Sequence, residues 1–348
     1  MIRWVAIAAA AALAAVDASA ATKMTVGNVT STSSGPLYIA KDKGYFAKAG
    51  LDVEIVVFES ATDMAPLLAT GRLQIAAGAV TVNFFNSLEK EFPVKLMSSR
   101  NTSPTYHNLL LRPDLVGTVK TPADLKGRVI ASNGRGSITT YEVGKIVESG
   151  GLTLKDVDVK IMGFGQMPVA LANKAVDAAL MIPPLMEIAV GKGVAVKWIW
   201  ADDIIKAQPV VIAVQQINTD WAAKNDAAMH AYMEQIIRSV QEYCEAYHHG
   251  ANRAEVVDIL SRYSNVKDKD ALEKMEWGSR DPEARVFEKS VMDVQDYYFQ
   301  EKLIDKKFAF KDLVDDRYRA AAVKKVGPFK LVHDDGKPGC RPDSVANR

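Results

Sequence analysis

Cysteine is scarce in this chain of 348 residues, which contains only Cys244 and Cys340. Two cysteines so far apart do not form a zinc site, because such a site needs several closely spaced ligands. In an oxidising compartment they either pair or remain separate thiols, and the sequence is compatible with both states. Cys340 lies in a polar C-terminal stretch, so we expect residues 331–348 to form a flexible tail.

A surplus of either charge is also lacking. The chain has 43 Lys and Arg against 42 Asp and Glu, which gives a formal net charge of +1. Because the two signs are interspersed, the sequence offers no basic stripe for a phosphate backbone, and we expect no nucleic-acid partner. Hydrophobic residues make up 48% of the chain, enough for one large core or two medium ones, and we favour two domains.

Catalytic and metal-binding motifs are missing as well. The sequence contains no G-x-S-x-G, P-loop or H-E-x-x-H motif, and the glycine-rich stretch 134–136 lacks the Rossmann spacing. The five histidines include one adjacent pair, His248 and His249, at the end of a helical pattern. We therefore expect no catalytic residue, no metal and no cofactor, and an enzyme is the distant alternative.

Long hydrophobic runs are absent beyond the N-terminus. Val5 to Val16 is almost wholly apolar, but it is shorter than the roughly 20 residues that span a bilayer. Arg3 precedes this run, and Ala18-Ser19-Ala20 fits a signal-peptidase site. We predict a signal peptide at residues 1–20, cleaved after Ala20, and a soluble protein exported to the periplasm. No cysteine follows that site, so a lipid anchor is not indicated.

From residue 24 to about 215, short apolar runs alternate with helical patterns. This alternation predicts an α/β protein with mostly parallel sheets. After Asn218 the pattern becomes helical, and an apolar stripe there is predicted to pack against the first half of the fold. Its members are Met229, Met233, Ile236, Ile237 and Val240.

The segment 33–54 joins two predicted strands through a helix. Gly35-Pro36 is typical of a helix start, and Gly50 of a helix end. The polar loop before this helix follows a strand, where an open α/β sheet binds ligands and a helix N-terminus offers free N–H groups. We therefore predict ligand contacts from Ser33, Ser34, Gly35 and Pro36, whereas Leu37, Tyr38, Tyr45 and Phe46 are expected in the core.

A second polar loop, residues 132–140, repeats this arrangement. It follows the apolar strand Val129–Ala131 and precedes a helical pattern, so backbone N–H groups and hydroxyls there suit a carboxylate, sulfonate or phosphate oxygen. The alternative is a plain helix cap with a flexible turn. The predicted contacts from this loop are Arg135, Gly136, Ser137, Ile138 and Thr139.

Other candidates follow further predicted strands. Arg100 suits an anion and Tyr106 suits a stacking contact, and the alternatives are a solvated loop arginine and a packed tyrosine. The remaining candidates are Ala79, Val80, Thr81, Gln166, Met181 and Pro183.

Two motifs resemble one protein family. The order G-P-L-Y-I-A-K-x-x-G-Y-F-x-x-x-G-L-D-V, residues 35–53, and the T-x-x-D-L-K-G pattern of residues 121–127 resemble the NMT1/THI5-like solute-binding proteins of bacterial ABC importers. The resemblance covers about residues 24–305. It implies a two-lobed periplasmic binding protein fold of type II, with residues 21–110 and 211–330 in lobe one, 111–210 in lobe two, and the C-terminal helices packed on lobe one.

The resemblance also implies a function. We expect a monomer that closes on a small organic anion, a sulfonate or a carboxylate, and delivers it to an inner-membrane ABC permease. The family usually has an acidic residue before the proline where Ile182-Pro183 stands here. This departure favours an apolar or aromatic ligand portion, and a merely rigid turn is the alternative. The alternatives are a thiamine-type pyrimidine ligand, a sensory receptor and a pyrimidine-synthase-like enzyme. The cysteine-rich motif of that enzyme is absent.

Overall fold

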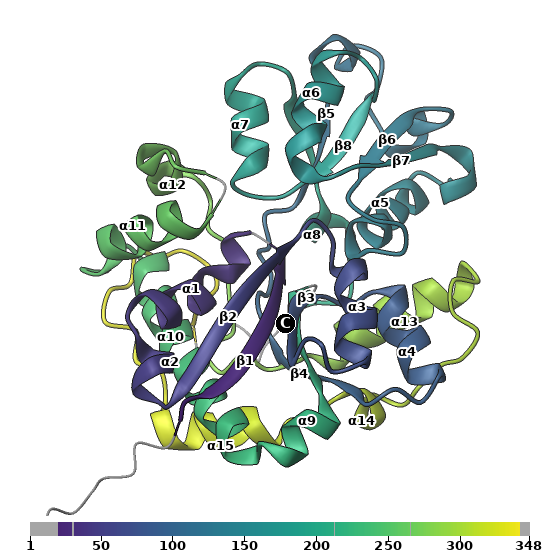
Figure 1. The fold of residues 1–348 in the computed structure, drawn as a ribbon. Coiled ribbons are helices and arrows are strands. Elements are labelled where there is room, and N and C mark those ends of the chain that lie inside the picture. The colour runs from purple at the N-terminus through teal and green to yellow at the C-terminus, as the bar shows by residue number, and fades with distance from the viewer. Residues whose placement is uncertain (1–19, 30, 212, 265, 342–348) are drawn as a thin grey trace, which may run out of the picture.

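The computed structural model describes residues 20–29, 31–211, 213–264 and 266–341. Residues 1–19 of the predicted signal peptide lie outside the described residues. None of the helices in the described ranges is long and apolar enough to cross a membrane. The chain forms two lobes, each built on one five-stranded sheet (Figure 1).

Each sheet is mostly parallel and contains one antiparallel strand next to its centre. Across the first sheet the strands are β2 (Leu51–Phe58), β1 (Thr22–Val29), β3 (Ile75–Ala79), β10 (Ala213–Asn218) and β4 (Val94–Ser99). Across the second they are β7 (Asp158–Ile161), β6 (Val129–Ser132), β8 (Ala178–Met181), β5 (Asn108–Leu111) and β9 (Val196–Trp200). The antiparallel strands are β5, the first strand in the sequence after the chain enters the second lobe, and β10, the first after it returns to the first lobe. The predicted α/β fold class is confirmed.

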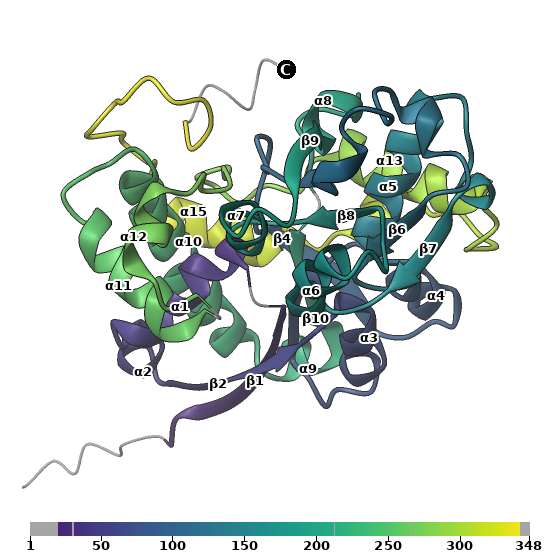
Figure 2. The ribbon, with the colours of Figure 1, turned by 90° about the horizontal axis from the view of Figure 1, so that it is seen from above.

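Helices cover both sheets. Those of the first lobe are α1 (Gly35–Asp42), α2 (Tyr45–Lys48), α3 (Ala61–Ala69), α4 (Val82–Glu89), α9 (Thr219–Lys224), α10 (Asp226–Tyr247), α11 (Arg253–Tyr263), α12 (Lys269–Lys274), α13 (Glu288–Gln300), α14 (Phe310–Leu313) and α15 (Arg317–Val326). Those of the second lobe are α5 (Ile138–Ser149), α6 (Met167–Ala172), α7 (Leu185–Gly191) and α8 (Ala201–Ile204). Figure 2 shows α10 and α11 gathered beside α1 and α2 on one side of the first sheet.

The chain passes from lobe to lobe twice. Asn108 already pairs with Met181 and Trp200 in the second sheet, so the first passage lies before β5 rather than at the predicted boundary of residue 110. The return lies between β9 and β10. The reason for the difference is that the short apolar run 108–111 suits either sheet equally well in sequence, and only its pairing decides.

The C-terminal helices complete the core of the first lobe, as predicted. The α10 stripe from Met229 to Val240 is buried in one cluster with Leu37, Tyr38 and Phe46 of the first crossover. Phe46 and Tyr232 stack with ring centroids 5.2 Å apart. Burying side chains of this size contributes about 1.5–3 kcal/mol each, so α10 stabilises the crossover that carries the first loop.

The predicted flexible tail is corrected for residues 331–341. Cys340 is fully buried and forms a disulfide with Cys244 of α10. The hydroxyl of Tyr247 donates to the carbonyl of Pro338, and the His248 ring pairs with Asp335 at 2.7 Å. These contacts, with the packing of Leu331 against the first-lobe core, fix this stretch. Residues 342–348 lie outside the described ranges.

Candidate functional site

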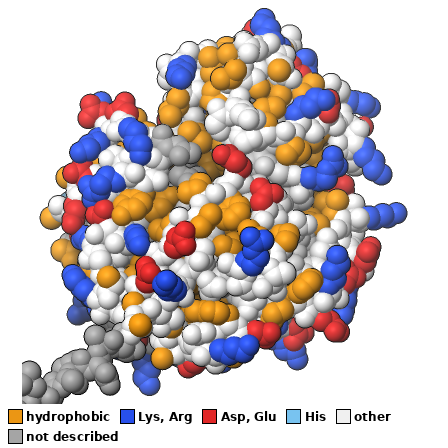
Figure 3. Space-filling view, in the orientation of Figure 1, with side chains coloured by type: hydrophobic (Ala, Val, Ile, Leu, Met, Phe, Trp, Pro, Cys, Tyr) orange, Lys and Arg blue, Asp and Glu red, His pale blue; other side chains and the backbone are white. Residues whose placement is uncertain are grey.

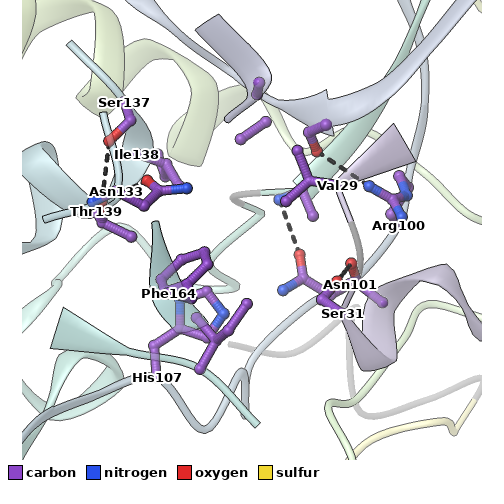
Figure 4. Close-up of a pocket in the computed structure, with 16 residues that line it drawn as sticks. Val29, Ser31, Arg100, Asn101, His107, Asn133, Ser137, Ile138, Thr139 and Phe164 are labelled. Carbon is purple, nitrogen blue, oxygen red and sulfur yellow. Dashed lines mark hydrogen bonds between the residues drawn. The ribbon is translucent and has the colours of Figure 1, made fainter. Parts of the chain in front are cut away.

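A cavity lies between the two lobes, at the carboxyl ends of the parallel strands (Figure 4). The space open to the centre of a water-sized sphere is about 60 Å³, which is room for a few water molecules. Its walls are largely apolar, with a small number of polar groups from both lobes, as in ordinary ligand sites. The lining residues are Val29, Ser31, Ser33, Ala61, Gly78, Ala79, Arg100, Asn101, His107, Asn133, Ser137, Ile138, Thr139, Phe164, Ile182 and Ala213.

Arg100 is the cation of the first-lobe wall. It follows β4 and is 5% exposed. Its Nη1 donates to the carbonyl of Ala77 at 2.5 Å, and its Nη2 donates to Asn28 Oδ1 at 2.9 Å and to Ser34 Oγ at 2.8 Å. Its Nε–H has no partner among the described residues. The side chain is therefore held rigidly while one donor remains for a ligand.

No carboxylate neutralises this guanidinium in the described part of the chain, since all its partners are neutral oxygens. Burial, together with the nearby charge of Arg280, lowers the pKa of Arg100 to about 10. The group remains protonated at neutral pH but lacks a counterion. A buried cation of this kind attracts an anion.

The second-lobe wall is the start of α5. The backbone N–H groups of Ile138 and Thr139, the first two of this helix, have no acceptor within the described ranges. Thr139 Oγ1 and its neighbours bond one another: Ser132 Oγ lies 2.7 Å away and Ser137 Oγ 2.9 Å away. The hydroxyls thus shape the loop, and the free N–H groups at the positive end of the helix dipole are the donors available to an anion.

Several contacts join the lobes beside the cavity. The N–H of Val82 in α4 donates to the carbonyl of Gly136 at 3.0 Å, and Asn133 Nδ2 donates to the carbonyl of Glu59 at 3.4 Å. The Tyr141 hydroxyl of α5 donates to Asp293 of α13 at 2.5 Å. The structure therefore shows the two lobes in contact around the cavity. Figure 3 shows hydrophobic side chains near the middle of the face with acidic side chains beside them, and charges of both signs over the rest of that face.

The structure brings six of the predicted site residues to the cavity, three from each lobe. They are Ser33, Ala79 and Arg100 of the first lobe and Ser137, Ile138 and Thr139 of the second. In Figure 4 Arg100 lies across the cavity from Ser137 and Thr139.

The other predicted residues lie elsewhere. Arg135 is exposed and points to an outer groove beside Leu154 and Glu301, because the turn ending at Gly136 (φ 67°) directs it away from the cavity. Tyr106 packs edge-on against Trp200, and Gln166 is exposed. The remaining predicted residues are buried outside the cavity. Among them, Ser34 Oγ accepts from Arg100 and the Thr81 side chain caps α4. They are Ser34, Gly35, Pro36, Val80, Thr81, Gly136, Met181 and Pro183.

Ten lining residues were not predicted. Most are small or apolar residues at strand ends or helix starts, such as Val29, Ala61 and Ala213, and nothing in their residue type signals ligand contact. Asn101, Asn133 and His107 have a detectable signal, because each is a polar residue flanking a buried strand. Asn101 accepts from the N–H of Ala213 at 3.0 Å, and its Nδ2 has no partner among the described residues.

Comparison with known proteins places the chain in a family. The family model described as NMT1/THI5 like matches residues 31–246, more than half of the chain. The chain belongs to the NMT1/THI5-like family. The match includes both polar loops of the cavity and ends within α10.

Individual relatives agree with this assignment. This NMT1/THI5-like chain is 28% identical over 144 residues to the formylaminopyrimidine-binding protein of Halalkalibacterium halodurans. That match spans 41% of this chain and 42% of the relative, so it covers less than half of either protein.

Solved structures show the same fold. The ligand-binding component of an ABC-type import system from Staphylococcus aureus, with zinc bound, gives a TM-score of 0.71 at 14% identity and covers 86% of this chain and 99% of its own. The alkanesulfonate-binding protein SsuA from Xanthomonas axonopodis pv. citri, bound to MOPS, gives 0.68 at 15% identity, with 85% and 98% covered. The desulfurization enzyme DSZB gives 0.63 at 12% identity, with 87% and 99% covered. The fold is that of the type II periplasmic binding proteins, as predicted, and an enzyme shares it.

Proposed function

We propose that this NMT1/THI5-like protein is a periplasmic substrate-binding protein that captures a small organic anion and delivers it to an ABC permease. The observation that supports this most is Arg100, a buried cation at the cavity whose hydrogen-bond partners are all neutral. An anionic ligand supplies the missing counterion. A monomer with a cleaved signal peptide at residues 1–20 belongs to the same proposal.

Capture proceeds by closure of the lobes. The ligand first meets the first-lobe wall, where Arg100 is already oriented by Asn28 and Ser34. Closure then adds the N–H groups at the start of α5 and the contacts around Gly136. Two lobes that meet around a ligand form one surface, which is what a permease recognises.

The lining also favours an apolar portion in the ligand. Phe164, Ile138 and Ile182 face the cavity, and Ile182 stands where the resembled family usually has a polar group. A carboxylate or sulfonate attached to a short aliphatic or aromatic body fits these walls, with its charge toward Arg100. The apolar body of the ligand is the more specific part of the proposed function.

Calorimetric titration tests it. The probes are taurine, ethanesulfonate, benzoate, phthalate and hydroxymethylpyrimidine, each added to wild-type protein, Arg100→Gln and Arg135→Gln. We expect at least one anion to bind, a loss of at least tenfold in affinity for Arg100→Gln, and no change for Arg135→Gln because that side chain lies outside the cavity. Equal affinities for all three proteins would contradict the role of Arg100.

A pyrimidine is the second candidate ligand, because the curated relative from Halalkalibacterium halodurans is a formylaminopyrimidine-binding protein. Binding of hydroxymethylpyrimidine alone would select this candidate and reject the anion. Chemical conversion of any probe during the titration would show an enzyme instead.

A further inference from the structure

His107 lies at the second-lobe side of the cavity, beside Phe164 (Figure 4). It directly precedes β5, and its backbone carbonyl accepts from the N–H of Ala201 at 3.0 Å. Behind the ring lies Glu142 of α5, whose side chain has no exposed surface. His107 Nδ1 is 2.9 Å from Glu142 Oε1 and 3.2 Å from Oε2. Among the described residues the Glu142 carboxyl has no other hydrogen-bond partner.

The other ring nitrogen, Nε2, belongs to a residue that lines the cavity. A proton must lie between Nδ1 and the carboxyl group, because both atoms otherwise carry only lone pairs. Nε2 has no hydrogen-bond partner in the described ranges, and it is not among the fully buried polar atoms that lack one. Nε2 is therefore not fully buried, and because His107 lines the cavity it is a donor or acceptor available to a ligand there.

The charges around His107 are negative. Glu142 faces it from α5, and Asp202 faces it from α8, where Asp202 Oδ2 accepts from the N–H and the hydroxyl of Thr105 at 2.7 and 2.8 Å. Burial alone would lower the pKa of His107, but the two carboxylates outweigh burial and raise the pKa above its ordinary value. No cation is among the groups that act on this ring.

We propose that His107 is a ligand-binding residue, an imidazolium held by Glu142 whose Nε2–H donates a hydrogen bond to the captured anion. This inference rests on the proposed function and adds a second, titratable cation to the site, on the lobe opposite Arg100. The ligand class is thereby narrowed to anions with at least two acceptor oxygens, so that one group is reached from both lobes. Capture is also linked to a proton on His107.

The direction of the pH dependence follows from this linkage. The pKa of His107 is raised above 6.5, so the imidazolium is the main form at pH 6.5 and is lost as pH rises through the higher value in the folded protein. Affinity is therefore constant in mild acid and falls in alkali, by at most tenfold per pH unit because one proton is involved. Arg100, whose pKa is about 10, stays mainly protonated up to pH 9.

Titration of benzoate and ethanesulfonate from pH 5.5 to 9, in two buffers of different ionisation enthalpy, tests the proposal. For wild-type protein we expect affinity to fall above neutral pH and binding to take up a fraction of a proton. His107→Gln keeps a donor but does not titrate, so its affinity is lower at pH 6 and independent of pH. In Glu142→Gln the fall moves to lower pH, because the partner charge is gone. The control His333→Gln, an exposed residue far along the chain, should behave as wild type.

A measurement without ligand separates this inference from the proposed function. The NMR pH titration of the His107 ring signal, assigned by its loss in His107→Gln, should give a pKa above 6.5 in wild-type protein and a lower value in Glu142→Gln. Absence of anion binding by wild-type protein at every pH would overturn the proposed function and this extension of it. Anion binding that is unaffected by His107→Gln, or a His107 pKa at or below 6.5, would overturn the inference and leave the proposed function standing.

Discussion

If the lobes close on the ligand, a side chain at Gly134, in the loop between β6 and α5, should weaken ligand binding. A Cβ atom at this position would lie 2.5 Å from Ser60 Oγ of the first lobe and 3.3 Å from Thr62 Oγ1. Within its own lobe the nearest atom is Ser137 Cβ, at 3.3 Å. The methyl group of Gly134→Ala therefore clashes mainly across the lobe junction.

The penalty is large enough to measure. Ser60 caps α3 by accepting from the N–H of Thr62 at 3.3 Å, so rotating its hydroxyl away loses a cap that contributes about 1 kcal/mol. Overpacking a fixed contact costs about 1–3 kcal/mol. Because this cost falls on the closed state, we expect the affinity of Gly134→Ala for the tightest-binding anion to drop by roughly 5- to 150-fold. Small-angle scattering with saturating anion should show incomplete compaction.

The matched control is Gly165→Ala, also in the second lobe, where an added Cβ meets no heavy atom within 4 Å. It should bind as wild type does. The free energy of unfolding of ligand-free Gly134→Ala should change by less than the free energy of anion binding, because the contact with Ser60 crosses the lobe junction. Wild-type affinity in Gly134→Ala would refute the reasoning, because the lobes would then bind ligand without meeting at Ser60.

Three further outcomes are expected. Replacing Cys244 and Cys340 by serine should lower the free energy of unfolding by about 2–4 kcal/mol in urea titration, because their disulfide closes a loop with a sequence separation of 96 residues. An unchanged urea midpoint would contradict a formed disulfide. Tyr141→Phe removes the hydrogen bond to Asp293 between the lobes and should weaken anion binding by about two- to tenfold, and unchanged calorimetric affinity would show that this contact does not support closure. Met233→Ala, at a fully buried position of α10, should cost about 2–5 kcal/mol of stability in the same urea assay without altering affinity, whereas a cost below 1 kcal/mol would contradict its place in the core.

Hydrophobic periodicity made the framework predictable. The spacing of Leu37, Tyr38 and Phe46 identified a buried helical face, and the stripe from Met229 to Val240 identified the helix that covers it. Both predictions concern which helix faces are buried, and the spacing of apolar residues in the sequence indicates a buried face directly. The two polar loops before α1 and α5 were also predictable in position, because ligand sites in α/β folds follow strand ends.

Side-chain direction was not predictable in the same way. Arg100 and Arg135 are both loop arginines next to a strand, yet one is 5% exposed at the cavity and the other is exposed on an outer groove. The difference comes from Ala77, Asn28 and Ser34, which hold Arg100 through contacts spanning 23 to 72 residues of sequence. His107 and Glu142, 35 residues apart, form a pair for the same tertiary reason.

Under the proposed function, ligand capture is coupled to closure, because no carboxylate of the described residues bonds Arg100. Burial contributes most to lowering the pKa of Arg100 to about 10, which corresponds to a few kcal/mol disfavouring the charged form. In this proposal, part of this cost arises when the second lobe covers the cavity and buries the guanidinium further. The empty closed state carries that cost in full, whereas an anion beside the guanidinium offsets it. If the proposed function holds, this cost biases the empty protein toward separated lobes and the loaded protein toward joined lobes. Placing a carboxylate near Arg100 should reverse this bias: Ala79→Asp, at the cavity wall, should favour the joined state in scattering without ligand and abolish anion binding in calorimetry. Retained anion binding in Ala79→Asp would show that the charge of Arg100 does not drive capture.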